Sequence, residues 1–83
     1  MGKRIIWNER ARADLRAIDR ETALHLLHGL ARFAATEEGE VKRLQGIEPP
    51  EFRLRIGDYR IRFYDHGGSI EVLRVLNRRE AYR

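Results

Sequence analysis

The chain has 83 residues, no cysteine, and seventeen basic against thirteen acidic side chains, for a formal net charge of +4. This length predicts a single domain over residues 1–83 with a small core. Without cysteine there is no disulfide or thiolate metal site, and a cytoplasmic location is expected. The apolar stretches are too short for a transmembrane helix or a secretory signal. A hydrophobic content of 42% is ordinary for a folded protein and argues against disorder.

The basic residues are nearly all arginine and are unevenly distributed. Fifteen of the seventeen are Arg, and only Lys3 and Lys42 are Lys. Residues 1–41 carry seven basic and seven acidic groups, whereas residues 42–83 carry ten basic and six acidic groups. Because the planar arginine fork suits phosphate, the second half predicts a polyanionic partner. The alternative is an arginine-rich surface that reflects only the base composition of the genome.

The first half of the chain predicts a strand followed by a helix. Residues Arg4–Trp7 are too few for a helix and are rich in strand-forming types. Asn8 is a favourable N-cap for a helix of about ten residues. Ala11, Leu15 and Ile18 recur at helical spacing and give that helix one narrow apolar stripe.

A second, more hydrophobic helix is expected from Arg20, with Asp19 as its N-cap, and should fade near residues 37–39. Its apolar positions are Leu24, Leu26, Leu27, Leu30, Ala31, Phe33 and Ala34. Two helices joined this closely form a hairpin, and their combined apolar face needs a sheet to pack against.

The second half predicts a connector and then strands. Residues 40–50 form the connector, whose closing Pro49-Pro50 disfavours helix. Apolar and charged residues alternate over 52–56 and 59–64, around Gly57-Asp58, a loop suited to a type II′ turn. Another strand is expected over residues 70–76. The predicted fold class is α+β: an N-terminal strand, a helix hairpin and a three-stranded antiparallel meander, with the helices on one face of an antiparallel sheet of about four strands.

The two-residue loop fixes the strand register and places like charges opposite one another. Arg55 faces Arg60, and Arg53 faces Arg62, on the side away from the apolar residues. Such pairs destabilise a strand pair, so they indicate a functional surface that binds phosphate. The alternative is a solvated face whose charges are screened by salt. Arg74 is a further candidate for this face, but its strand is apolar on both sides, which leaves its orientation open.

Other chemistries have little support in the sequence. His25 and His28 stand at i, i+3 without a neighbouring carboxylate or cysteine, so no metal site is expected. Ser69 is the single serine and has no partner residues that would suggest a catalytic triad. Neither a metal nor an organic cofactor is expected.

Three segments, residues 41–46, 52–64 and 77–83, together resemble the RelE/ParE superfamily of bacterial toxins, and the last resembles RelE-type toxins in particular. The resemblance extends over essentially the whole chain. It implies the toxin of a toxin–antitoxin system, a ribosome-dependent endoribonuclease that cleaves mRNA without a metal. The partners implied are a cognate antitoxin, the ribosome with its mRNA, and promoter DNA only through the antitoxin complex. No membrane partner is expected.

The resemblance also assigns roles to residues. The catalytic candidates that it implies are Arg53, Arg55, Arg60, Arg78 and Tyr82. The RNA-binding candidates are Lys42, Arg43, Arg62, Arg74, Arg79 and Arg83. Glu51 falls near a position where the family often has a strand lysine. Because the catalytic candidates on the strands are all arginines, which are poor proton donors, the general acid is not identified.

Two other functions stay open at this stage. A ParE-like inhibitor of DNA gyrase would share the fold and act by binding alone. A catalytically inactive relative that binds nucleic acid would also account for the arginine-rich strands.

Overall fold

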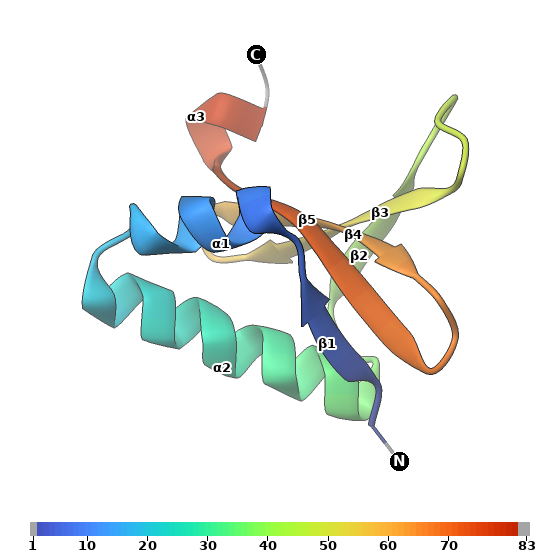
Figure 1. Cartoon of the computed structure of the whole chain (residues 1–83), viewed down its shortest axis with the longest axis horizontal. Coiled ribbons are helices and arrows are strands. Elements are labelled where there is room, and N and C mark those ends of the chain that lie inside the picture. Colours follow the sequence, from blue (N-terminus) through green and yellow to red (C-terminus); the bar gives the residue numbers. More distant parts are fainter. Residues whose placement is uncertain (1, 82–83) are drawn as a thin grey trace.

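Two long helices lie against one side of a β-sheet, and the computed structural model describes residues 2–81 (Figure 1). The expected N-terminal strand and helix hairpin are both present. Along the chain the elements are β1 (Arg4–Trp7), α1 (Glu9–Arg16), α2 (Arg20–Thr36), β2 (Glu40–Leu44), β3 (Glu51–Ile56), β4 (Tyr59–Asp65), β5 (Ser69–Asn77) and α3 (Arg78–Ala81).

The five strands lie in the order β1-β5-β4-β3-β2, which makes β1 and β2 the two edges of the sheet. β3, β4 and β5 form the expected antiparallel meander, and the α+β class is confirmed. β1 pairs in parallel with β5, whereas the sequence predicted an antiparallel sheet. The sheet is therefore mixed and has one strand more than expected.

The expected connector over residues 40–50 is wrong in its first part, because Glu40–Leu44 forms the edge strand β2. This strand pairs antiparallel with β3 and places Val41 opposite Leu54. An edge strand is held by backbone hydrogen bonds on one side, and charged residues are common on it. Its residues are largely exposed, so no alternation of apolar and polar residues marks it in the sequence.

Both helices begin at the predicted caps. The side chain of Asn8 accepts a hydrogen bond from the Ala11 amide at 2.8 Å, and Asp19 accepts one from the Thr22 amide at 3.0 Å. These contacts satisfy amides that have no partner within the helix. α2 ends at Thr36, and its C-cap Glu37 has a left-handed φ of 59° that breaks the helical repeat.

The buried stripe of α2 is narrower than expected. Its buried members are Leu26, Leu30, Phe33 and Ala34. Leu24 is 45% exposed and Ala31 is also exposed, so the sequence assigned the buried stripe too broadly. A helix that packs on one sheet buries only one side, and an unbroken run of apolar residues does not show which side that is.

The core lies between α2 and the meander. Leu54, Ile61 and Phe63 are each at most 2% exposed, as the strand alternation predicted. The Phe63 ring contacts Phe33 on α2 and Phe52 on β3, with centroid separations of 5.5 and 5.6 Å. These aromatic contacts join the helix layer to the sheet.

A register shift resolves the orientation of β5. Arg62 pairs with Arg74, while the next residue, Phe63, pairs with Val72, so Leu73 is the extra residue of a bulge. The bulge shifts the alternation by one residue. Val72 and Val75 are consequently both buried, although their spacing of three would put them on opposite faces of a regular strand.

α1 protects the edge of β5 beyond the point where β1 ends. The carboxylate of Asp14 accepts hydrogen bonds from the Val75 amide at 2.9 Å and from Arg74 Nε at 2.8 Å. Burial by itself would raise the pKa of Asp14, but the hydrogen bonds from Arg74 and Val75 hold it below its ordinary value. A side chain thus pairs an edge amide that no strand reaches.

Candidate nucleic-acid interface

The face of the sheet away from the helices carries a row of cations across four strands, and we call it the open face. Lys42, Arg53, Arg62 and Arg74 are successive register partners on β2, β3, β4 and β5. Neighbouring strands lie about 4.8 Å apart, so the row concentrates positive charge along one line. The predicted pairing of Arg53 with Arg62 is confirmed.

Arg55 and Arg60 form a second pair on the same face, nearer the turn that joins β3 to β4, and this predicted pairing is also confirmed. Gly57 in that turn has a φ of 57°, and Glu37 is the single non-glycine residue with positive φ in the described part of the chain. Asp58 therefore has a negative φ, as the second residue of a type II′ turn requires. The turn chemistry sets the register that brings the arginines together.

Four candidate residues line one hollow on the open face. Lys42, Arg53, Arg55 and Arg60 surround a space of about 360 Å³, together with Gly39, Glu40 and Val41. Three strands contribute the cations, so the hollow depends on the sheet and not on a flexible loop. We call these four cations and their hollow the basic hollow.

Arg60 is the most constrained of the four. It is only 4% exposed, and its Nη1 donates to the backbone oxygens of Tyr59 at 3.2 Å and Gly57 at 3.4 Å. These carbonyls hold the guanidinium beside the hairpin turn. Arg60 therefore supplies a positive charge at a fixed place in the wall of the hollow, which favours binding of an anion without reorganisation.

Each carboxylate near the open face pairs with a different arginine, and these ion pairs differ widely in their exposure to solvent. Glu51 is 6% exposed and accepts a hydrogen bond from Arg62 Nε. Asp14 holds Arg74 from the adjoining edge. Glu40 approaches Arg55 at 3.7 Å, but both side chains are more than half exposed, so this ion pair contributes little.

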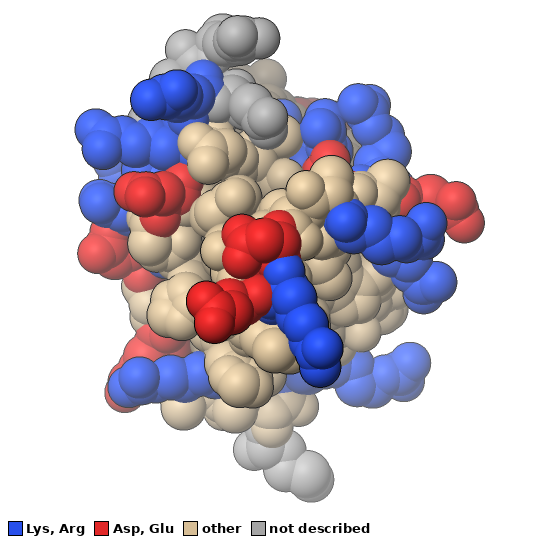
Figure 2. All heavy atoms as spheres, turned by 90° about the vertical axis from the view of Figure 1, so that its left-hand side faces the viewer, with Lys and Arg blue, Asp and Glu red and all other residues tan. Residues whose placement is uncertain are grey.

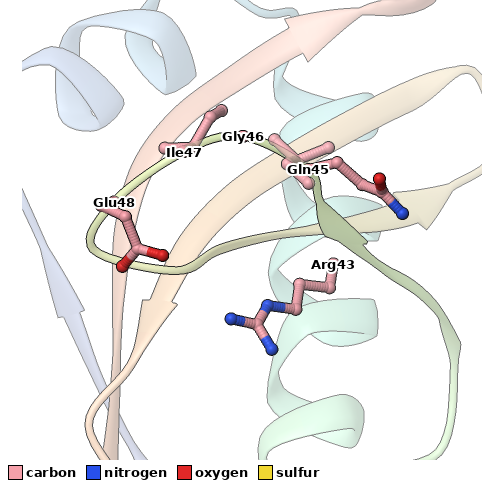
Figure 3. A pocket seen from close by; sticks show the side chains of 6 residues that line it. Arg43, Gln45, Gly46, Ile47 and Glu48 are labelled. Carbon is pink, nitrogen blue, oxygen red and sulfur yellow. The ribbon is translucent and has the colours of Figure 1, made fainter.

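Arg43 lies apart from the other candidates. It pairs with Phe52, a residue of the helix-covered face, and lines a separate hollow formed with residues 44–48. Figure 3 shows Arg43 in this second hollow with the side chains of the β2–β3 loop. The structure thus does not bring Arg43 to the basic hollow.

The C-terminal candidates follow β5, and the first of them, Arg78, is hydrogen-bonded to the β3–β4 turn. The Arg78 amide donates to the Asp58 oxygen at 2.6 Å, and the Arg79 amide donates to Asn77 Oδ1 at 3.1 Å. These contacts start α3 beside the turn that also holds Arg60. Arg78 and Arg79 are exposed. The remaining candidates, Tyr82 and Arg83, lie outside the described residues.

Sequence reasoning missed Asp14 and Glu40, two of the carboxylates that pair with the arginines. Asp14 falls between Ala11 and Ile18 within the apolar stripe of α1, and an acid in such a stripe is a signal that it has a buried partner. Glu51 stands beside the hairpin arginines in the sequence as an offsetting charge, but its burial was not predicted, because the residue before an alternating strand has no predictable burial. Glu40 was missed because β2 itself was not expected.

The side of the molecule where α1 meets α2 has a different charge pattern. Figure 2 shows acidic and basic side chains intermixed there. Within residues 2–81, no three His, Cys, Asp or Glu side chains gather as a metal site would need. In the same part of the chain, neither long helix has the length and apolar character to cross a membrane.

Solved structures with this fold include chains of toxin–antitoxin complexes. One is the archaeal RelE-RelB complex from Pyrococcus horikoshii OT3, with a TM-score of 0.72 and 20% identity, covering 94% of this chain and 97% of the other. Another is RelBE2 from Mycobacterium tuberculosis, with a TM-score of 0.70 and 21% identity, covering 94% and 100%. The RelB-RelE complex from Methanococcus jannaschii has a TM-score of 0.66 and 21% identity, covering 93% of this chain and 94% of the other. These likenesses show the fold. No curated protein matches the chain.

A family model now adds to this fold and shows that the chain is a toxin of the RelE/ParE superfamily, as the sequence resemblance predicted. The family model described as the ParE toxin of type II toxin–antitoxin system, parDE, matches residues 5–82. The chain belongs to this family and is the toxin component of a type II toxin–antitoxin system.

Proposed function

We propose that this toxin is a ribosome-dependent endoribonuclease that cleaves mRNA in the cytoplasm. The basic hollow on the open face is the observation that supports this function best. It gathers Lys42, Arg53, Arg55 and Arg60 from three strands around a space open to a phosphate group. Arginine is well suited to this task, because its planar fork binds phosphate oxygens through two parallel hydrogen bonds.

The proposed reaction uses the 2′-hydroxyl of the substrate as nucleophile. Its oxygen attacks the adjacent phosphorus, its proton passes to a base, and the bond from phosphorus to the 5′-oxygen breaks. The departing 5′-oxygen takes up a proton, and the products are a 2′,3′-cyclic phosphate and a 5′-hydroxyl. Arg53, Arg55, Arg60 and Arg78 stabilise the negative charge that develops on the phosphorane.

Tyr82 is the proposed general base, on the strength of the sequence resemblance. A guanidinium group close to a tyrosine favours its phenolate form, and a phenolate can accept the proton of the 2′-hydroxyl. Arg79 and Arg83 are proposed to contact ribosomal RNA. The ribosome's part is to hold the mRNA with the 2′-oxygen in line with the bond that breaks, so free RNA is a poor substrate.

The solved complexes of similar fold contain an antitoxin with the toxin, which supports a cognate antitoxin as the partner of this chain. We propose that this antitoxin is acidic enough to complement the excess of positive charge in residues 42–83. Promoter DNA is then contacted only through the toxin–antitoxin complex.

Inhibition of DNA gyrase is the second candidate function. The observation in its favour is the family model that matches the chain, which is that of the ParE toxin of the parDE system. A gyrase inhibitor acts by binding and needs no group that transfers a proton. The role of Tyr82 therefore separates the two functions.

The deciding experiment is incubation of the purified toxin with programmed ribosomes, followed by mapping of mRNA 5′ ends, with a gyrase supercoiling assay in parallel. Cleavage is expected on ribosomes, with gyrase unaffected. An mRNA with a 2′-deoxynucleotide at the cleavage position must resist cleavage, and Tyr82→Phe must slow it. Gyrase inhibition together with intact mRNA would replace the proposal with the second candidate.

A further inference from the structure

Two arginines in the row of cations on the open face pair with carboxylates. Lys42 and Arg53 occupy the β2–β3 end of the row, and Arg62 and Arg74 the β4–β5 end. Each arginine of the second pair has a carboxylate of its own, Glu51 for Arg62 and Asp14 for Arg74. Each of these two ion pairs is neutral as a whole.

We propose that Glu51 withdraws Arg62 from nucleic-acid binding, and that the phosphate-binding surface is confined to the basic hollow on the β2–β3 side of the open face. This inference rests on the proposed function, since it assumes that RNA is bound on the open face. It concerns which cations bind and the part that Glu51 plays as a positioning residue.

The burial of Glu51 is the first argument. Its side chain is only 8% exposed, whereas that of Arg62 is 34% exposed. A phosphate that took Arg62 away would leave a buried carboxylate without its charged partner, and such a state is strongly unfavourable. A hydrated phosphate is therefore a less favourable partner for Arg62 than Glu51 is.

Net charge is the second argument. The Arg62 guanidinium keeps N–H groups beyond the one given to Glu51, so a hydrogen bond to RNA is not prevented by geometry. The pair as a whole is neutral, however, and a neutral pair releases no counterions when a phosphate approaches. Lys42 and Arg55 lie in the basic hollow, and the ion pair of Arg55 with Glu40 is exposed and weak. Their charges count fully in binding.

The position of the basic hollow is the third argument. It lies toward the turn that joins β3 to β4, where Arg60 is held by the turn carbonyls and the Arg78 amide is tied to Asp58. Glu51 stands at the opposite end of β3, five residues before Ile56 at the turn. Glu51 thus neutralises Arg62 at the far end of the open face. Phosphate binds at the other end, near the β3–β4 turn where α3 begins.

The experiment measures how binding of a short, labelled, single-stranded 2′-O-methyl RNA depends on salt. This probe binds but cannot be cleaved, because it has no free 2′-hydroxyl. For single strands the slope of log K against log salt changes by about 0.7 for each phosphate contact. Lys42→Gln and Arg55→Gln are each expected to reduce the slope by about 0.7, whereas Arg62→Gln leaves it at the parental value.

Glu51→Gln is the matched opposite of Arg62→Gln. It frees the Arg62 charge, so binding becomes tighter and the slope steepens by up to about 0.7. The double variant Glu51→Gln/Arg62→Gln removes both charges, lets the two amides pair and restores the parental slope. It also keeps the test valid if either single variant proves unstable in urea, because its site holds no unpaired buried charge.

A fall in slope for Arg62→Gln as large as that for Arg55→Gln, or a double variant with a reduced slope, would overturn the inference and leave the proposed function standing. If RNA binding by the parent protein does not depend on salt and is unchanged by both Lys42→Gln and Arg55→Gln, the open face is not the RNA site. The two failures are distinct.

Discussion

Two neighbouring rows of side chains on the same three strands face opposite ways. The row toward the helices is Leu54, Ile61 and Val75, and the row on the open face is Arg53, Arg62 and Arg74. The first row is at most 3% exposed and stabilises the fold by burial, about 1.5–3 kcal/mol for each side chain. The second row sets like charges against one another, which a sheet does not favour.

The contrast separates what the fold requires from what the function requires. Apolar residues of the helix-covered face satisfy each other, so that face is complete within this chain. On the open face Glu51 pairs with Arg62 and Asp14 pairs with Arg74, while Lys42 and the exposed Arg55 bring positive charge to the basic hollow. A surface of that kind is stabilised further by an anionic partner.

Truncating the apolar row should have the largest effect on stability. Leu54 is 2% exposed, and Leu54→Ala is expected to lower the free energy of unfolding by about 2–5 kcal/mol. Arg55→Gln, one residue along and exposed, is the control and should change it by less than about 0.5 kcal/mol. Urea unfolding followed by circular dichroism measures both. Equal stabilities for the two variants would contradict the assignment of the core to this face.

Under the proposed function, removing a charge from the basic hollow should abolish most of the cleavage activity. Arg60→Gln is expected to slow single-turnover cleavage on ribosomes by about 10²–10³-fold, the usual effect of losing one preorganised donor. Arg32, exposed on α2, offers a matched control, since Arg32→Gln removes the same charge from the helix side. Because Arg60 is buried, its variant must first be shown to unfold at a urea concentration near that of the parent. Full activity in a folded Arg60→Gln protein would exclude it from the mechanism.

The edge of β5 gives an intermediate effect on stability. Asp14→Asn removes the negative charge of the carboxylate and so weakens its hydrogen bonds with Arg74 and Val75. The free energy of unfolding should fall by about 1.5–3 kcal/mol. Hydrogen exchange at the Val75 amide reports the local effect, since this amide bonds to Asp14 at 2.9 Å. A Val75 amide that exchanges no faster in the variant would mean that α1 does not protect this edge.

Features of this protein that depend on adjacent residues could be predicted from the sequence. The Gly57-Asp58 turn and the alternation around it were enough to predict every pair between β3 and β4. The caps Asn8 and Asp19 were predictable because the capping contact is local. In these cases a few adjacent residues determine the geometry.

The features that the sequence did not predict all depend on contacts between distant segments. β2 is a strand because β3 offers it hydrogen bonds, and the bulge at Leu73 exists because Val72 and Val75 both enter the core. The partners of Arg62 and Arg74 lie 11 and 60 residues away along the chain. Distances of that kind leave no trace in a local pattern, so the division of the open face was found only in the structure.

The smallest expected effect concerns a charged contact that joins the N-terminal segment to the loop between β4 and β5. Lys3 Nζ lies 2.9 and 3.0 Å from the two carboxylate oxygens of Asp65, and the Gly67 amide donates to Asp65 at 2.9 Å. The hydrogen bond from Lys3, followed by that from Gly67, lowers the pKa of Asp65 below its ordinary value. A lowered carboxyl pKa stabilises the folded chain above the ordinary value of 3.8, and this contribution is lost as the pH falls through the lower folded value.

Asp65→Asn should therefore lower the free energy of unfolding by about 1 kcal/mol at neutral pH, a modest figure because the carboxylate is partly exposed to solvent. The difference from the parent should shrink as the pH drops below about 4 and also as salt is raised, since both remove the charge interaction. Lys3→Gln made alone and together with Asp65→Asn completes a double-mutant cycle, in which the coupling energy isolates this ion pair. Urea unfolding at pH 7 and at pH 3 measures all four proteins. A difference between parent and Asp65→Asn that persists undiminished at pH 3 would assign the effect to the Gly67 turn contact and not to the charge of Lys3.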